Sequence, residues 1–323
     1  MQISVALCTY NGERFLKAQL DSILNQSTLI NEIIVCDDHS NDNTLAVLQE
    51  YKARHSHLFI IHTNSKNLGI VKNFEKAISL CTGDIIFLTD QDDIWNNNKV
   101  ESGLNFFRNN SNCYGVFSDA ELMDDTSTLS NKTLWELLQF NEAISIDTNP
   151  DIFRYLLLYR NVVTGACLAI KKEALDFILP FPKDGKMLHD QWIGLKLGEY
   201  NRIGLIRQPL LKYRLHSAQE TKAIWQNFTD KSRMVRSSII TDDVNVFPFE
   251  YYRYWKKKLT ALNAMKDYGI CINDSIVKEV KSKIRKGLIA HLRSLSFFQR
   301  KSTLLKLYLK QQEEVAFTDI VKI

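Results

Sequence analysis

The first 120 residues alternate between short apolar runs and amphipathic segments, and this alternation constrains the fold more than any other feature of the chain. Short apolar runs indicate buried strands, whereas apolar residues at every third or fourth position indicate helices. The strands are predicted at Ile3–Leu7, Glu32–Cys36, Leu58–His62, Asp84–Leu88 and Tyr114–Ser118. The helices are predicted at Glu13–Leu24, Asp42–Tyr51, Ile70–Leu80 and Lys99–Phe107. This order defines an α/β fold, in which helices flank both faces of a mostly parallel sheet.

The later part of the chain is less regular and then becomes helical. A loop followed by a strand is predicted over Asn161–Ile170, and a further strand over Leu210–Leu215. Two short helices are predicted between them, over Lys171–Ile178 and Asp190–Leu197. The apolar spacing is helical nearly throughout the remainder, with Thr241–Phe249 as the best linker candidate because it contains proline and several polar residues.

The apolar residues and the cysteines exclude several classes of protein. No run of 18 apolar residues occurs, so no membrane-spanning helix is expected. The first residues, MQISVALCTYNGERF, lack the basic start and the apolar core of a signal peptide, and we expect the protein in the cytoplasm. The 6 cysteines are dispersed without a CxxC pair, which favours reduced core residues over metal binding or disulfides.

The loop after the fourth predicted strand, TDQDDIW at residues 89–95, carries the carboxylates of Asp90, Asp92 and Asp93. Carboxylates this close repel one another unless a cation or hydrogen-bond donors neutralise them. Mg2+ and Mn2+ prefer carboxylate and phosphate oxygens, whereas the alternative is an acidic turn that caps the next helix. Ligands of α/β sheets bind at the carboxyl ends of strands, and this position favours a metal site.

Two further loops follow predicted strands. In the first, Thr9-Tyr10-Asn11-Gly12, Gly12 allows a tight turn and Tyr10 offers an aromatic face to a base. The second, DDHSNDNT at residues 37–44, offers carboxylates to a base or a ribose. Each loop is also explained as a helix cap, with Asn11 or Asp42 as the capping residue. No GxGxxG or GxxxxGK[ST] motif occurs, which disfavours a dinucleotide-binding Rossmann site and a P-loop.

Taken together, VALCTYNG, IIVCDDHSNDNT and GDIIFLTDQDDIW resemble the inverting nucleotide-sugar glycosyltransferases of family 2, which have the GT-A fold. The resemblance covers Met1 to His216, and the DQDDIW form resembles the branch rich in bacterial rhamnosyltransferases. It implies a GT-A-type, Rossmann-like nucleotide-binding sheet in a catalytic domain over residues 1–240. Residues 1–120 would form the nucleotide-sugar-binding half and residues 121–240 the acceptor-side half, followed by a helical basic region over residues 241–323.

The resemblance also implies residues for the nucleoside diphosphate sugar, a dTDP- or UDP-sugar. Asp38 would hold the base together with the first loop, and Asp90 the ribose. Lys72 would approach the diphosphate, although a solvated helix lysine is the alternative. The family often has glycine where this chain has His39, so the turn at that position is expected to vary. The expected nucleotide-sugar-binding residues are Thr9, Tyr10, Asn11, Asp38, Lys72, Asp90 and Gln91.

By the same resemblance, Asp92 would bind the Mg2+ or Mn2+ that bridges the diphosphate, with Asp93 as support. His216 would meet the metal or the diphosphate, and Arg214 or Lys222 would add positive charge. The metal would stabilise the leaving nucleoside diphosphate as a Lewis acid. A lone histidine is more often structural, and that alternative stays open for His216.

The catalytic base implied by the family is Asp190, in the sequence HDQW. It would take the proton of an acceptor hydroxyl while that oxygen attacks the anomeric carbon from the face opposite the leaving group. Gly165 and Trp192 would lie on the acceptor side. The alternatives are a helix cap for Asp190, a packed Trp192 and an ordinary turn at Gly165.

Two other functions are compatible with parts of the sequence. A nucleotidyltransferase would share the sheet and the carboxylates, but its first loop is usually rich in glycine and basic residues, unlike CTYNGERF. A non-catalytic module that binds glycans or nucleic acid would explain the basic tail, but the chain has no recognised nucleic-acid motif, and we expect no nucleic-acid partner.

Positive charge is concentrated at the end of the chain. Residues 251–323 hold 16 Lys and Arg and 6 Asp and Glu, whereas the whole chain has a net charge of only +4. Apolar Ile276, Val280, Ile284 and Leu288 recur between these basic residues. This pattern suits a helix lying on an anionic membrane surface, near a glycan or lipid-linked oligosaccharide acceptor. The alternative is that the apolar stripe packs on protein, including a second copy of the chain.

Overall fold

The computed structural model describes residues 1–140, 151–216, 219, 230–296, 299, 300 and 303. Contacts divide the chain into an N-terminal unit, Met1–Gln219, and a C-terminal unit, Glu220–Ile323. The division falls before the domain boundary expected at residue 240, because helix α11 (Asp230–Ile240) packs on helix α12 (Pro248–Asp267). Thr241–Phe249, the expected linker, is therefore largely a turn inside the C-terminal unit. Lys222 lies outside the described residues.

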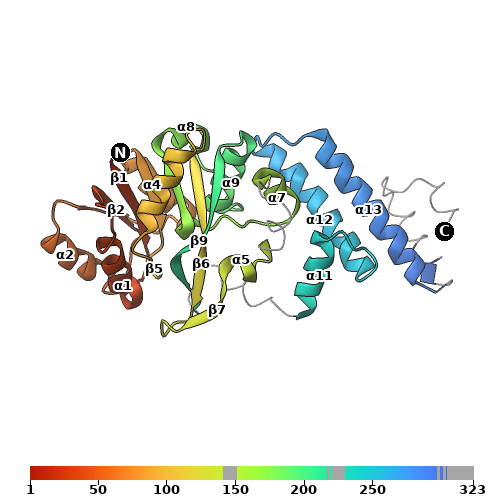
Figure 1. Cartoon of the computed structure of the whole chain (residues 1–323), viewed down its shortest axis with the longest axis horizontal. Helices are drawn as coiled ribbons and strands as arrows, with labels where there is room; N and C mark the ends of the chain where they lie inside the picture. The colour runs from red at the N-terminus through yellow and green to blue at the C-terminus, as the bar shows by residue number, and fades with distance from the viewer. Residues whose placement is uncertain (141–150, 217–218, 220–229, 297–298, 301–302, 304–323) are drawn as a thin grey trace. The chain divides into compact units, whose positions relative to one another are not determined.

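Parallel strands and their connecting helices form the first half of the N-terminal unit (Figure 1). The strands are β1 (Ile3–Thr9), β2 (Glu32–Asp37), β3 (Phe59–Thr63) and β4 (Ile85–Thr89), and the helices are α1 (Glu13–Leu24), α2 (Thr44–Arg54), α3 (Ile70–Leu80) and α4 (Lys99–Asn109). β1 pairs in parallel with β2 and β4, and β2 pairs in parallel with β3. All the strands and helices predicted for this half are present. The apolar runs of β1, β2 and β4 are buried in the sheet, whereas β3, at the end of the strand order, buries only Phe59.

The second half of the same unit extends the sheet with mixed strand directions. Its strands are β5 (Ile94–Trp95), β6 (Gly115–Met123), β7 (Leu129–Thr133), β8 (Leu168–Lys171) and β9 (Ile203–Arg214). Its helical segments are α5 (Leu134–Leu137), α7 (Ile152–Leu158), η1 (Gly165–Cys167), η2 (Lys172–Ala174), α8 (Leu175–Ile178) and α9 (His189–Glu199). The sheet order is β3-β2-β1-β4-β8-β6-β9-β5, with β7 paired to β6. β8 is antiparallel to both β4 and β6, and β9 is parallel to β6, so the sheet is mostly but not wholly parallel.

The described part of the C-terminal unit consists mainly of α11, α12 and α13 (Asp274–Ser294). The apolar stripe of α13 is buried, with Ile276, Val280, Ile284 and Leu288 between 0% and 8% exposed. α12 packs along α13, and the two backbones approach so closely at Gly287 that a Cβ there would lie 3.0 Å from the backbone of Tyr252. The stripe is therefore covered by protein and is not available to enter a lipid surface. Within the described residues, no helix combines the length and the apolar character that crossing a membrane requires.

Candidate active site

The acidic loop lies at the carboxyl end of β4, as predicted, and the pKa values of two of its carboxylates, Asp90 and Asp93, are raised. Burial, together with the charges of Asp92 and Asp190, raises the pKa of Asp90 to about 8. Burial and the charges of Asp92 and Asp90 raise the pKa of Asp93 well above its ordinary range. The Oδ2 atom of Asp93 is buried and has no hydrogen-bond partner among the described residues. The loop therefore concentrates negative charge that calls for a cation.

Arg214, the last residue of β9, holds this loop in place through hydrogen bonds. Its side chain is 1% exposed and its guanidinium lies 4.4 Å from the ring centre of Phe15. Its Nε donates to the carbonyl oxygen of Asp92 at 2.7 Å, and its backbone N–H donates to Oδ1 of Asp93 at 2.9 Å. One terminal nitrogen donates to the carbonyl of Asp124 and the hydroxyl of Ser127. Arg214 is therefore part of the buried frame of the acidic loop, a role that the expectation of diphosphate charge did not include.

Asp92 and His216 lie together, as expected for two ligands of one metal. Nε2 of His216 lies 2.8 Å from Oδ2 of Asp92, and the His216 ring packs on Phe15 with centroids 5.0 Å apart. Among the described residues, no three His, Cys, Asp or Glu side chains converge closely enough to hold a metal ion by themselves. A carboxylate and an imidazole fit Mg2+ or Mn2+ only where substrate phosphates and waters supply the other ligands, which is the usual arrangement for Mg2+. The residues thus fit a metal that arrives with a nucleotide.

The first loop is joined to the acidic loop by Gln91. Its side-chain oxygen accepts from the Tyr10 backbone N–H at 2.8 Å, and its side-chain nitrogen donates to the Tyr10 carbonyl at 2.9 Å. A Cβ at Gly12 would lie 2.1 Å from that side-chain oxygen, so glycine is required for this close approach. Asn11, at φ 48, accepts from the Asn41 N–H through its side chain, which ties the second loop to the first. The Tyr10 side chain is 44% exposed, as an aromatic face for a base should be.

Asp38 is buried and contacts the turn that leads into α3, a segment to which the sequence analysis assigned no role. Its carboxylate accepts from the side chain of Asn64 and from the backbone N–H groups of Leu68 and Gly69. Asp38 thus orders the turn that leads into α3. His39 adopts φ 70, the left-handed conformation that favours glycine, so the backbone here has a shape that the family's glycine would also allow.

Two other residues expected to bind the donor are engaged inside the protein. The hydroxyl of Thr9 is buried and donates to the carboxylate of Asp37 at 2.9 Å. Thr9 therefore stabilises the first loop from inside the protein. The ammonium of Lys72 lies 2.5 Å from Glu75 and 3.4 Å from the Phe181 carbonyl oxygen. Contact of Lys72 with a diphosphate stays a prediction.

Asp190 lies in the first turn of α9, and hydrogen-bond donors hold its carboxylate in place. Its carboxylate accepts from the Asn161 side chain at 3.0 Å and from the Gly165 N–H at 3.2 Å. Burial raises the pKa of Asp190 to about 6, although these hydrogen bonds oppose the shift. A carboxylate with this pKa is ionised at neutral pH and is a stronger base than an ordinary aspartate, as a proton acceptor requires.

The neighbour of Asp190, His189, explains why residue 165 is glycine. The His189 ring stacks on Phe74 with centroids 4.0 Å apart, and a Cβ at Gly165 would lie 2.5 Å from Nε2 of His189. Burial lowers the pKa of His189 to about 3, so the ring is neutral. It packs between Phe74 of α3 and the turn at Gly165. Trp192, expected on the acceptor side, is only 7% exposed and donates its indole N–H to the Ile178 carbonyl. These contacts fit the alternative of a packed Trp192, and its place on the acceptor side stays a prediction.

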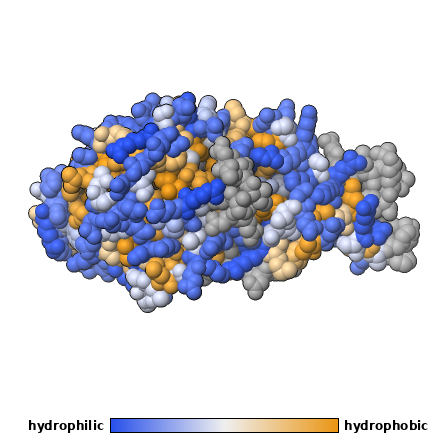
Figure 2. All heavy atoms as spheres, viewed as in Figure 1, coloured by the Kyte–Doolittle hydropathy of each residue, from blue (hydrophilic) through white to orange (hydrophobic). Residues whose placement is uncertain are grey.

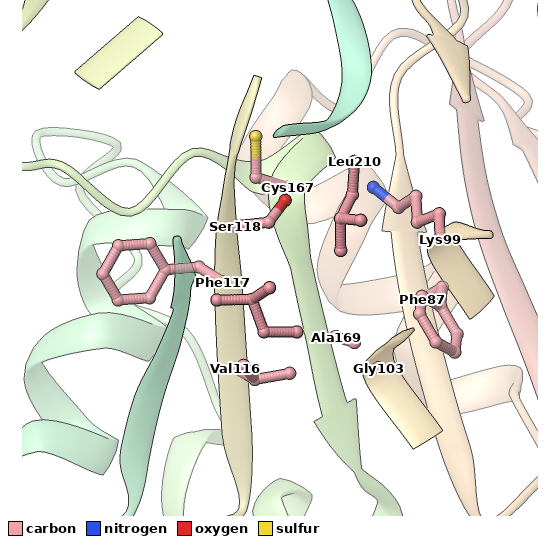
Figure 3. Close-up of a pocket in the computed structure, with 10 residues that line it drawn as sticks. Phe87, Lys99, Gly103, Val116, Phe117, Ser118, Cys167, Ala169 and Leu210 are labelled. Carbon is pink, nitrogen blue, oxygen red and sulfur yellow. The ribbon is translucent and has the colours of Figure 1, made fainter. Parts of the chain in front are cut away.

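Lys99 is a buried cation that the sequence analysis left unassigned. Its ammonium donates to the Ala166 carbonyl at 2.5 Å, lies 4.7 Å from the ring centre of Trp95, and is 2% exposed as a residue. Figure 3 shows its nitrogen pointing toward the side of a cavity where Ser118 and Cys167 lie. The cavity measures only about 10 Å³, at the lower limit for one water molecule, so Lys99 serves the protein frame rather than a bound ligand. A lysine at the first position of a helix opposes the helix dipole, and this misfit was the signal available in the sequence.

Lys99 links α4, which follows the acidic loop, to the turn that positions Gly165 against Asp190. Replacing it by methionine keeps the length of the side chain but leaves the Ala166 carbonyl unsatisfied, at a cost of about 1–3 kcal/mol. We expect Lys99→Met to lower the melting temperature by several degrees and the transfer rate by about tenfold. Lys171→Met is the matched control, because Lys171 also donates to a carbonyl, that of Ser111, but at an exposed site. Equal melting temperatures and rates for Lys99→Met and the unchanged protein would show that the link is dispensable.

The fold and the site together define a class of protein. A mostly parallel sheet flanked by helices carries an acidic loop at the carboxyl end of β4, which is the arrangement of GT-A glycosyltransferases. Residues 4–179, more than half of the chain, match the profile of Glycosyl transferase family 2. The chain belongs to this family and is a sugar-transferring enzyme.

Three known proteins illustrate the similarity. dTDP-rhamnosyl transferase RfbG of Shigella flexneri is 27% identical over 318 residues, which cover 94% of this chain and 97% of that protein. The structure of S. aureus TarS 1–349 with UDP-GlcNAc has a TM-score of 0.56 at 16% identity, over 91% of this chain and 73% of that one. The structure of the mannosyltransferase PcManGT of Pyrobaculum calidifontis, with GDP-Man and Mn2+, has a TM-score of 0.52 at 14% identity, over 97% of this chain and 81% of that one. The two structures support the GT-A fold assignment.

Proposed function

We propose that the protein is an inverting, metal-dependent glycosyltransferase of polysaccharide biosynthesis. It moves a sugar from a nucleoside diphosphate donor to a hydroxyl of a glycan or a lipid-linked saccharide. The observation that carries the proposal is the pairing of Asp92, in the loop after β4, with His216. Nε2 of His216 lies 2.8 Å from Oδ2 of Asp92 although 124 positions separate the two residues in the sequence.

The first candidate for the donor is dTDP-rhamnose. It is supported by the similarity to a dTDP-rhamnosyl transferase along nearly the whole of both chains. TarS binds UDP-GlcNAc and PcManGT binds GDP-Man, so a UDP-sugar is the second candidate and a divalent cation is part of the proposal. Exposed Tyr10 would stack on the base, and the acidic loop would take the ribose and the diphosphate.

In the proposed reaction, Asp190 takes the proton from the acceptor hydroxyl while that oxygen forms a bond to the anomeric carbon. The bond from that carbon to the phosphate oxygen breaks, and its electron pair leaves with the nucleoside diphosphate. Attack and departure occur on opposite faces of the sugar, so the anomeric configuration is inverted. A divalent cation held by Asp92, His216 and the phosphates would supply the positive charge that stabilises the leaving group. Arg214 keeps Asp92 in place, and Gly165 and Asn161 orient Asp190.

Purified protein should release dTDP from dTDP-rhamnose in the presence of Mg2+ or Mn2+, and EDTA should abolish the release. Asp92→Asn should lower transfer by about 100-fold or more, because the removed charge faces the developing negative charge of the leaving group. Asp84→Asn is the matched control, since Asp84 is an exposed carboxylate just before the opposite end of the same strand. NMR of the product should show the anomeric configuration opposite to that of the donor.

Three results would contradict the proposal. Undiminished transfer in EDTA would exclude the metal, and retained anomeric configuration would exclude direct displacement. A donor panel in which no nucleotide sugar is hydrolysed or raises the melting temperature would exclude the enzyme assignment for this site.

A further inference from the structure

The ring of Phe15, in the first turn of α1, contacts two residues that bond to Asp92. The guanidinium carbon of Arg214 lies 4.4 Å from the centre of this ring. The ring centres of Phe15 and His216 are 5.0 Å apart, with an angle of 54° between the two planes. Arg214 bonds to the main chain of Asp92, and His216 bonds to its carboxylate. One phenylalanine therefore contacts both side chains that reach Asp92 from the end of β9 and just beyond it.

The partners of this ring, rather than its exposure, indicate its role. Phe15 is half-buried, and the face of the molecule in Figure 2 is mostly hydrophilic, with hydrophobic residues interspersed. Single apolar side chains are common on such a surface and need no explanation. A second guanidinium, that of Arg14, lies 4.7 Å from the ring centre, and Arg14 also pairs with Asp125 in the turn between β6 and β7. Guanidinium groups are attracted to the electron-rich face of an aromatic ring, so this site favours a ring over an aliphatic side chain.

Arg214 and His216 are two positions apart, and the chain between them continues along β6. The N–H of Leu215 donates to the carbonyl of Met123, the last residue of β6. Side chains two positions apart in an extended chain lie on the same side, which explains how one ring contacts both. The backbone N–H of His216 donates to the side chain of Gln219 at 3.4 Å. That bond holds the main chain, whereas rotation of the imidazole about its Cβ–Cγ bond is intrinsically broad and is restricted by contacts of the ring itself.

We propose that Phe15 is a positioning residue, whose ring holds the imidazole of His216 beside the carboxylate of Asp92 before donor and metal bind. The inference rests on the proposed function, in which these two side chains hold a divalent cation together with phosphates. An imidazole that is already in place loses less conformational freedom when the cation binds, so the ring raises the affinity for the metal. Phe15 acts through His216 and not by contact with the reacting groups.

Titration of Mn2+ followed by electron paramagnetic resonance tests the proposal. It is carried out with whichever of dTDP, UDP and GDP raises the melting temperature of the unchanged protein most. Phe15→Leu keeps an apolar side chain but removes the ring, and it should weaken Mn2+ binding by about fivefold, whereas Phe15→Tyr keeps the ring and should stay within about twofold of the unchanged protein. The matched control is Phe106→Leu, because Phe106 is a half-buried phenylalanine of α4 that packs on Phe107. This control should leave the Mn2+ affinity unchanged.

A double-mutant cycle identifies the residue through which Phe15 acts. His216→Ala should weaken Mn2+ binding, and adding Phe15→Leu to it should cause no further loss. The same loss in the presence and the absence of the His216 side chain would overturn the proposal, because the ring would then act through Arg214 or through the fold. Melting temperatures show whether each variant is folded during the titration. If Phe15→Leu does not fold, Phe15→Met takes its place, because a flexible methionine fills irregular space.

Two further results would overturn the inference alone. They are equal Mn2+ affinities for Phe15→Leu and the unchanged protein, and equal losses of affinity in Phe15→Leu and Phe106→Leu. A different result concerns the proposed function. If the unchanged protein binds no Mn2+ with any of the three nucleoside diphosphates, the proposed metal site is wrong and this inference is overturned with it.

Discussion

Replacing Asp190 by asparagine should lower the rate of sugar transfer by roughly 1000-fold, within the 100- to 10,000-fold range of general bases. The amide has the shape of the carboxylate but cannot accept the proton of the acceptor hydroxyl. Donor affinity should stay within about twofold of the unchanged protein, because a base acts on the acceptor in the transition state. Steady-state transfer rates and donor titration by calorimetry measure the two effects separately.

The same residue predicts the pH dependence of the reaction. Because burial raises the pKa of Asp190 to about 6, the base is protonated below that pH, and the rate at saturating substrate should rise as pH increases through 6. Asp190→Asn should remove this limb of the profile. Asp176→Asn is the control, since Asp176 is an exposed acid in the first turn of the preceding helix, α8. A fall in donor affinity as steep as the fall in rate would make Asp190 a binding or folding residue instead.

Replacing Arg214 by methionine should destabilise the N-terminal unit by about 3–5 kcal/mol, the usual cost of removing one partner of a buried charge network. The change removes the Arg214 donor from the carbonyl of Asp92, one of two donors from the carbonyl of Asp124, and a buried cation from the acidic loop. We expect a melting temperature lower by about 10 °C, with loss of Mn2+ affinity in the presence of donor. Thermal unfolding and Mn2+ titration followed by electron paramagnetic resonance give the two values.

Arg214→Lys tests whether charge alone is sufficient. A lysine restores the charge but not the fork of donors, so it should recover only part of the stability. The control is Arg202→Met, because Arg202 also donates to a carbonyl, that of Asn112, and packs on Tyr114, but at a half-buried site next to the start of β9. If Arg214→Met melts at the temperature of the Arg202 variant, the frame does not depend on Arg214.

The predicted fold is accurate where the chain repeats one pattern. Helices Glu13–Leu24 and Ile70–Leu80 begin and end at the predicted residues, since apolar residues recur along their buried faces, with one buried polar residue in each, Gln19 and Asn73. β7 was not predicted because its sequence, LSNKT, is polar and exposed and lacks the alternation of apolar and polar residues that indicates a strand. The stripe of α13 was recognised as apolar, but periodicity shows that a face is buried without showing what covers it.

The candidate site was predictable only to the level of the loops. Strand order determines which loops meet at one edge, so TYNG, DDHS and DQDD could be grouped from the sequence. Which atoms remain available to a ligand depends on internal hydrogen bonds that the sequence does not display. The carboxylate of Asp38 accepts hydrogen bonds from the turn before α3, and Lys72 contacts Glu75. The indole N–H of Trp192 donates to the carbonyl of Ile178. Lys99 and Arg214 belong to the frame of the candidate site, because they bond the carbonyls of Ala166 and Asp92.

The dependence of the acidic loop on β9 affects how the protein is assembled during synthesis. Asp92 and Asp93 are bonded to Arg214 and His216, whose positions along the chain are 121 to 124 residues later. A chain that has emerged only as far as α4 contains the carboxylates and Lys99 but not Arg214 or His216. The acidic loop therefore lacks their hydrogen bonds until β9 is inserted beside β6. The hydrogen-bonded structure of the loop therefore forms only after nearly the whole N-terminal unit has been synthesised.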